Sequence, residues 1–154
     1  MANASANFEA DFLELLFLNT DITGIGDATG LQGSPTAGSL YTRLCTDAVT
    51  VTDTQLGTEC AYTGYVAKGV AVARSAAGWE IDSATPSIIQ NTAEIAFGAC
   101  TAGTETVKYM EVWKNNTGAT IADRIAWVEL GATLAVSAGV TPKFAAGEIT
   151  FEFD

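Results

Sequence analysis

The fold is decided by the last segment of the chain, Gly147-Glu148-Ile149-Thr150-Phe151-Glu152-Phe153-Asp154. Its apolar residues, Ile149, Phe151 and Phe153, alternate with polar ones. Because the side chains of a β-strand point to opposite faces in turn, this alternation predicts a strand with one buried face. Such a strand must lie against a sheet or a partner. We therefore expect the C-terminal residues to belong to the fold and not to a tail.

Short strand-like segments precede this terminal strand at regular spacing. We expect strands at residues 40–45, 48–54, 62–74, 79–81, 87–97, 107–114 and 125–130, and around Val136. The segment 107–114 is apolar on both faces, which indicates a central strand, and Gly69 suggests a bulge or bend within 62–74. Many short strands with turns between them predict an all-β fold, an antiparallel, jelly-roll-like β-sandwich with one short N-terminal helix.

The expected helix covers residues 7–18, with Asn7 as its N-cap and Asn19 at its end. Its apolar stripe consists of Phe8, Phe12, Leu15 and Leu16. Leu13 and Phe17 broaden this face, so we expect the helix to lie between two surfaces. Two interpretations stay open, because the helix can cover the open end of a sheet or pack on a neighbouring subunit.

The segment 20–39 is predicted to be a loop, since five glycines and Pro35 allow no long regular element. Its glycine spacing misses the GxGxxG phosphate-binding pattern, and no strand precedes it. A loop of this length in a small protein is usually functional or ordered at an interface. At 154 residues, we expect one domain, 1–154, with 1–39 as an N-terminal arm and 40–154 as the β core.

The composition argues against several classes of function. A net charge of −11, from 18 acidic and 7 basic residues, disfavours binding to nucleic acid or to anionic membranes. The chain has no histidine, the usual general base and a common metal ligand, so we expect no enzyme, no catalytic residues and no cofactor. No signal peptide and no membrane-spanning segment is expected, and the protein is predicted to be made in a reducing cytoplasm.

Cysteines stand at positions 45, 60 and 100, without a CxxC pair, so no metal site is expected. We expect all three thiols to be reduced and buried, while a bridge between Cys45 and Cys60 stays an open alternative. Trp113 is predicted to lie in the core, and Trp79, which follows Ala76-Ala77-Gly78, is predicted to lie near the surface.

Carboxylates on predicted strands offer one catalytic alternative. The residues concerned are Glu94, Glu111, Glu129, Glu148 and Glu152. Two of them across a cleft would suit a glycoside hydrolase, with tryptophans as sugar platforms. No spacing singles out a pair, however, and we expect these glutamates to face solvent beside apolar strand positions.

A series of weak motifs, taken in order, carries a resemblance. The motifs are Phe12-Leu13-Glu14-Leu15-Leu16-Phe17, Tyr41-Thr42-Arg43-Leu44-Cys45-Thr46, Gly64-Tyr65-Val66-Ala67-Lys68, Asn91-Thr92-Ala93-Glu94-Ile95-Ala96-Phe97, Val112-Trp113-Lys114 and the closing pattern from Val136 through Phe151. In this order the chain resembles a family of small tailed-phage virion proteins, of head-decoration or minor tail-fibre type. The glycine-rich loop 20–39 and the long segment 46–63 depart from that family.

The resemblance implies a structural protein of the virion, without catalytic residues. Our first hypothesis is a decoration or cement protein that binds the outer capsid surface through the major capsid protein, as a homotrimer. The expected contact residues are Phe8, Phe12, Leu15, Leu16, Ile22, Ile25 and Leu31. The alternative is a tail-fibre or receptor-binding module that recognises a host surface glycan through aromatic residues such as Trp79 and Tyr62.

Overall fold

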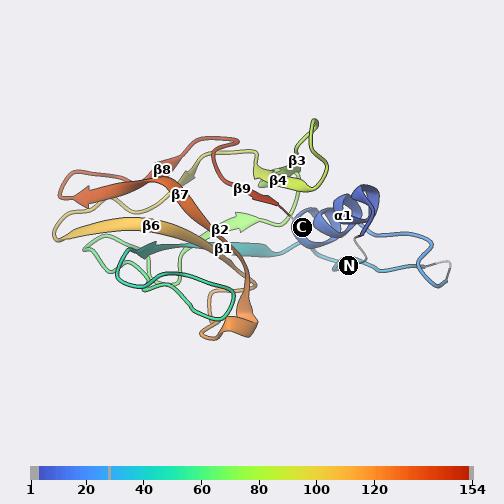
Figure 1. Ribbon diagram of the computed structural model, residues 1–154, viewed down its shortest axis with the longest axis horizontal. Coiled ribbons are helices and arrows are strands. Elements are labelled where there is room, and N and C mark those ends of the chain that lie inside the picture. Colours follow the sequence, from blue (N-terminus) through green and yellow to red (C-terminus); the bar gives the residue numbers. More distant parts are fainter. Residues whose placement is uncertain (1–3, 28, 153–154) are drawn as a thin grey trace. The chain divides into compact units, whose positions relative to one another are not determined.

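The computed structural model describes residues 4–27 and 29–152 (Figure 1), so Phe153 and Asp154 of the expected terminal strand lie outside the described residues. The chain divides into two compact units. The first, here called the terminal unit, comprises Met1–Gly38, Ala73–Glu94 and Ala145–Asp154. The second, the sheet unit, comprises Ser39–Val72 and Ile95–Phe144. The expectation of a single domain stays a prediction.

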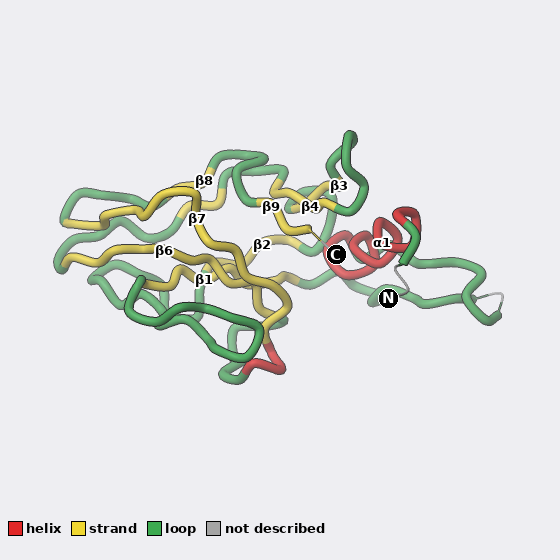
Figure 2. Tube along the Cα trace, viewed as in Figure 1, coloured by secondary structure: helices red, strands yellow, loops and turns green. Residues whose placement is uncertain are grey.

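The sheet unit is built on four strands. They are β1 (Ser39–Thr46), β2 (Val70–Ala73), β6 (Thr104–Trp113) and β7 (Arg124–Ser137), in the order β2-β1-β6-β7. The β1–β6 and β6–β7 pairs are antiparallel. A second, two-stranded sheet pairs β5 (Ile95–Ala96) with β8 (Lys143–Phe144), also antiparallel. A short 3-10 helix, η2 (Ile121–Asp123), leads into β7. The predicted all-β antiparallel class with one short N-terminal helix is confirmed (Figure 2).

Strand β6 is central, as its two apolar faces predict. It pairs with β1 on one side and β7 on the other. Each of its residues Val107, Tyr109, Met110, Val112 and Trp113 is at most 2% exposed. Trp113 thus lies in the core, as expected.

Strand β7 is longer than predicted and lies at the edge of its sheet. The predicted strand 125–130 and the one around Val136 are one strand of 14 residues. Its pairing is interrupted: Val107 opposes Leu134 and Tyr109 opposes Glu129, so the single residue Lys108 faces the four residues 130–133. Such a bulge bends an edge strand and disrupts the row of backbone groups through which foreign strands pair.

The terminal unit combines a helix with a three-stranded antiparallel sheet. Helix α1 (Ala6–Leu13) continues into a π-helical turn, η1 (Glu14–Leu18). The strands β3 (Trp79–Ile81), β4 (Ile88–Asn91) and β9 (Thr150–Glu152) pair in the order β3-β4-β9. In the last strand, Ile149 and Phe151 are buried whereas Glu148, Thr150 and Glu152 are exposed, which confirms the expected face.

Three aromatic rings form the centre of the terminal unit. The ring centroid of Phe17 lies 5.0 Å from that of Trp79 and 6.2 Å from that of Phe151. Beside them, the buried amide of Asn91 donates to the carbonyl oxygens of Ala93 and Ala145, each at 2.8 Å. The side-chain oxygen of Asn91 accepts from the backbone N–H of Ile149 at 2.9 Å. This amide therefore links strand β4 to the C-terminal segment.

The helix differs from the prediction at its start and on its buried face. Ser5, not Asn7, is the N-cap, and its hydroxyl accepts from the Phe8 N–H at 3.3 Å. Serine is as good a capping residue as asparagine, and the Ser5 hydroxyl accepts from the third N–H of the helix that begins at Ala6. The buried residues of the helix are Leu13 and Phe17. At its end Asn19 adopts a left-handed conformation with φ 63°, as expected for a terminating residue.

One predicted strand is wrong, one is shorter than predicted and one is divided. Segment 48–54 forms turns, with one isolated bridge between Thr52 and Gln55. Segment 62–74 is a strand only from Val70, because Gly64, Lys68 and Gly69 have positive φ and interrupt extended backbone. The bend expected at Gly69 is present, with φ +85°. Segment 87–97 divides into β4 and β5.

Candidate interaction surface

The seven predicted contact residues differ in how far they are exposed. Phe8, Ile25 and Leu31 are exposed, at 41%, 37% and 43% of their surface. Phe12, Leu15 and Leu16 are half-buried. Ile22 is buried at 5%, with its backbone paired to Leu31 through hydrogen bonds of 2.8 and 2.9 Å. Of the seven predicted contact residues, these three are therefore the most accessible.

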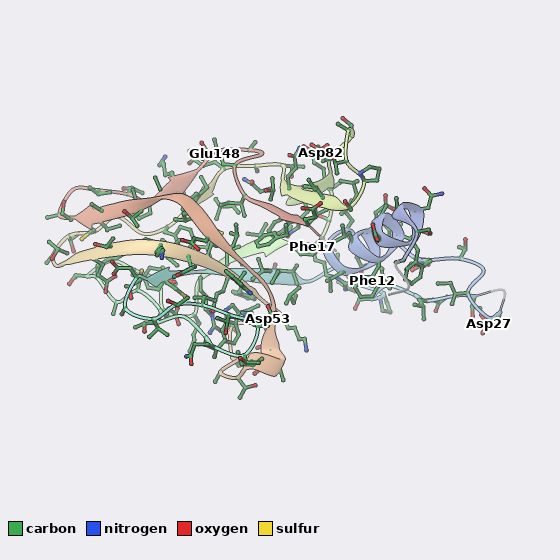
Figure 3. All side chains as sticks on the ribbon, viewed as in Figure 1. Phe12, Phe17, Asp27, Asp53, Asp82 and Glu148 are labelled. Carbon is green, nitrogen blue, oxygen red and sulfur yellow. The ribbon has the colours of Figure 1, made fainter. Side chains whose placement is uncertain are left out.

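Hydrogen bonds join the two ends of the loop 20–38. The side chain of Asn19 donates to the Ser34 carbonyl at 2.8 Å and accepts from the Ser34 N–H at 2.7 Å. Asp21 accepts from the Gly33 N–H at 2.7 Å. These contacts bring the two ends of the loop together, and in Figure 3 its tip, marked by Asp27, projects away from the helix.

At the tip, one carboxylate organises the turn. Asp27 Oδ1 accepts from the hydroxyl and the N–H of Thr29, at 2.7 and 2.9 Å, and from the Gly30 N–H at 2.8 Å. The Thr29 hydroxyl and these backbone donors lower the pKa of Asp27 below its usual value. The ordered tip presents Ile25 on one side of the turn and Leu31 on the other.

Arg74 secures the end of the helix. Its Nε donates to the Leu16 carbonyl at 2.7 Å, and its guanidinium also donates to the Leu15 carbonyl. Carbonyls in the last turn of a helix lack partners within the helix, and a cation there also suits the helix dipole. Arg74 thus fastens the end of the helix to the segment Ala73–Glu94 of the terminal unit.

A buried polar cluster in the sheet unit corrects the expectation that Glu111 faces solvent. Glu111 is 1% exposed and pairs with Arg124 at 2.9 Å. Its carboxylate also accepts from Trp113 Nε1 at 3.0 Å and from the Gly57 N–H at 2.9 Å. Arg124 in turn donates to the carbonyls of Thr52 and Gln55. These bonds fasten the segment 47–60, drawn as loop in Figure 2, to the sheet.

Other carboxylates of the suggested hydrolase set lie on the surface. Glu94, Glu129, Glu148 and Glu152 are exposed, and Glu129 pairs with Lys108 at 3.3 Å. Within residues 4–27 and 29–152, no three Cys, Asp or Glu side chains are grouped so that they could hold a metal ion. No helix in this described part of the chain is long and apolar enough to cross a membrane.

The aromatic residues named for glycan binding are buried. Trp79 is 0% exposed, which overturns the expectation that it lies near the surface. Its ring fills the space between Phe17 and Phe151, and glycine and alanine neighbours gave no sign of that packing. Tyr62 is 4% exposed, and its hydroxyl donates to the Gly98 carbonyl at 2.9 Å. Neither ring offers a face on which a sugar can stack.

The three cysteines are free and buried, as expected, and Cys45 and Cys60 are not bridged. Burial is the main cause that raises the pKa of the Cys45 thiol, with the charge of Glu111 as a further cause. Burial likewise raises the pKa of Cys60, with Glu105 contributing. These thiols therefore stay protonated at neutral pH, and a protonated thiol is a poor nucleophile.

We expect the native protein to resist thiol reagents. At roughly pH 8, dithionitrobenzoate should modify none of the cysteines in the native protein and all three after denaturation.

Because folding raises the pKa of Cys45 and Cys60, the unfolded thiols lose protons first as the pH rises. The free energy of unfolding therefore keeps its full value below about pH 8.5, the pKa of an unfolded cysteine. Above that pH it falls by up to about 1.4 kcal/mol per pH unit for each of the two thiols. Rapid modification of the native protein would contradict this expectation.

Antiparallel sheets and one short N-terminal α-helix make the described part of the chain a small all-β protein. The family described as "Podophage GP4 fiber I protein gp80" matches residues 26–152, and the chain belongs to this family. It is therefore a phage virion protein, as its motifs suggested. The match begins after α1, so the helix lies outside it. No curated protein matches the chain.

Proposed function

We propose that the chain is a structural subunit of a podophage fibre, held in the virion by the exposed apolar side chains of its terminal unit. The observation that carries this proposal is the family match over residues 26–152, which takes in the whole sheet unit. The family description names a fibre and not a head. We therefore propose the fibre in preference to the capsid surface and the major capsid protein as the place of attachment.

Attachment through the terminal unit is supported by where the exposed apolar residues lie. Five large hydrophobic side chains are exposed in the described residues, and Phe8, Ile25 and Leu31 belong to the terminal unit. Ile25 and Leu31 stand on the loop that Asp27 and Asn19 keep ordered. An ordered loop loses less conformational entropy on binding than a flexible one. If such a contact is repeated along a fibre, several weak sites act together and bind more tightly than any one of them alone.

The competing hypotheses predict different places on the particle. Electron cryomicroscopy of the parent phage is expected to place the fold in the tail fibres, whereas density on the head would favour the decoration protein. A homotrimer stays a prediction that the same maps would test. Host-glycan recognition remains the alternative role for a fibre, but it would need residues other than Trp79 and Tyr62, since both are buried.

Substitution of the exposed apolar residues is expected to weaken incorporation. The variant F8S/I25S/L31S should enter particles about tenfold less than wild type, because each serine removes apolar surface that a partner would bury. Quantitative blotting of particles purified from complemented phage measures this. Deletion of 1–39 would be a poorer test, because it also removes Phe17 from the core.

A matched control uses the two exposed hydrophobic residues of the sheet unit, Val66 at 56% and Ile121 at 36%. The variant V66S/I121S should incorporate like wild type. Equal loss for both variants would show that the terminal unit has no special part in attachment. Unchanged incorporation of F8S/I25S/L31S would remove these side chains from the contact.

A further inference from the structure

The two units carry very different charges. The described residues of the terminal unit include ten acidic side chains and one basic one, Arg74. The sheet unit has seven acidic and six basic residues. Almost all of the excess negative charge of the chain therefore belongs to the unit that also carries Phe8, Ile25 and Leu31.

Little of this negative charge is neutralised by Arg74, because its guanidinium is bound to the carbonyls of Leu15 and Leu16. Each of the ten acidic residues is exposed or half-buried, and none lies in the core. Some have structural duties: Asp21, Asp27 and Asp82 accept backbone hydrogen bonds within their own loops. On α1, Glu9 and Asp11 stand next in sequence to the exposed Phe8 and the half-buried Phe12.

We propose that the N-terminal part of the terminal unit, α1 together with the loop 20–38, docks on a basic surface of another virion protein. The proposal rests on the proposed function and names the chemistry of the partner. A face that combines exposed apolar residues with uncompensated carboxylates fits a surface where apolar residues are surrounded by lysine and arginine. A second copy of the same face would be repelled, since both carry the same sign of charge. Nucleic acid would be repelled for the same reason.

The opposite charges give the contact a recognisable signature. Attraction between the acidic face and a basic partner speeds encounter and is screened by salt, with a Debye length that falls from about 10 Å at 0.1 M to about 3 Å at 1 M. Apolar contacts alone lack this salt dependence and strengthen in many salts. Incorporation should therefore weaken as sodium chloride rises.

The test uses purified full-length chain added to particles prepared from a mutant of the parent phage that lacks the gene. The variant E9Q/D11N removes two charges from α1 with little change of shape. The control D47N/E129Q removes two charges from exposed positions of the sheet unit. Both variants have the same net charge, so a difference between them reports the position of the charge. Thermal unfolding of each variant shows that the fold is kept.

We expect wild type to bind the particles about tenfold less at high than at low salt, and E9Q/D11N to bind about fivefold less than wild type at low salt only. D47N/E129Q should follow wild type. Salt-independent binding, or equal binding of the two variants, would contradict the proposal that the partner surface is basic. Neither outcome would contradict the proposed role in the fibre. Failure of wild type to bind at any salt concentration would instead count against the proposed function.

Discussion

Replacement of Trp79 with alanine is expected to destabilise the terminal unit by roughly 3–5 kcal/mol. The side chain is 0% exposed and touches Phe17 at a centroid distance of 5.0 Å and Phe151 at 6.2 Å. Alanine would remove both ring contacts and leave a cavity among residues from all three segments of the unit. Denaturant titration followed by circular dichroism measures the loss. Because Trp113 and Trp127 belong to the sheet unit, the fluorescence of the variant reports that unit separately.

The variant Trp79→Phe is the control. Trp79 Nε1 has no hydrogen-bond partner although it is buried, so phenylalanine keeps an aromatic ring and removes an unsatisfied donor. The relief of that donor offsets part of the lost volume, and we expect a loss below about 1.5 kcal/mol. A loss below about 1 kcal/mol for Trp79→Ala would contradict the central place that the structure gives to this ring.

Replacement of Glu111 with alanine is expected to cost the sheet unit roughly 3–5 kcal/mol, because it breaks a buried ion pair by removing one partner. Arg124 would lose its carboxylate, and both Trp113 Nε1 and the Gly57 N–H would lose their acceptor. The segment 47–60 should loosen, since Glu111 and Arg124 fasten it to the sheet. Denaturant titration of Glu111→Ala in the Trp79→Phe background, followed by the fluorescence of Trp113 and Trp127, measures the effect against Trp79→Phe alone.

An exposed ion pair in the same sheet gives the matched control. Lys108 and Glu129 are joined at 3.3 Å, with side chains 33% and 54% exposed. Glu129→Ala should change stability by at most about 1 kcal/mol, because water already screens this pair. If Glu111→Ala cost no more than Glu129→Ala, the buried cluster would have no special part in holding the segment 47–60.

Alternation and burial on both faces were the features that the sequence predicted well. The terminal strand and the central strand β6 follow directly from the spacing of Ile149 and Phe151 and from the apolar run at 107–113. The strand predicted at 48–54 and the first part of the one predicted at 62–74 were wrong, because valine and threonine favour extended backbone only where a neighbouring strand supplies hydrogen bonds. Positive φ at Gly64 and Lys68 depends on packing that no local pattern reveals.

The candidate surface was predictable only in part. Helical periodicity placed Phe8 and Phe12 on one stripe, yet the core took Leu13 and Phe17, which lie four residues apart on a neighbouring stripe. The glycines and Pro35 that predict the loop do not tell which of its apolar residues is buried. Ile22 pairs with Leu31 and is buried, whereas Ile25 is exposed. Likewise, nothing local marked Glu111 as buried, because its partner Arg124 lies 13 residues away. Whether such a side chain is buried depends on contacts with residues that lie far away in the sequence.

The division of the terminal unit among three segments has a consequence for synthesis on the ribosome. All residues of the sheet unit have been made once Phe144 is added, whereas the terminal unit still lacks Ala145–Asp154, which supply β9 and the ring of Phe151. The residues of the sheet unit are therefore complete before those of the terminal unit, and the N-terminal helix gains its last packing partner only from the final segment. A polypeptide that stops short of the final strand would retain its sheet but lack a completed acidic face. Assembly would then select for full-length subunits.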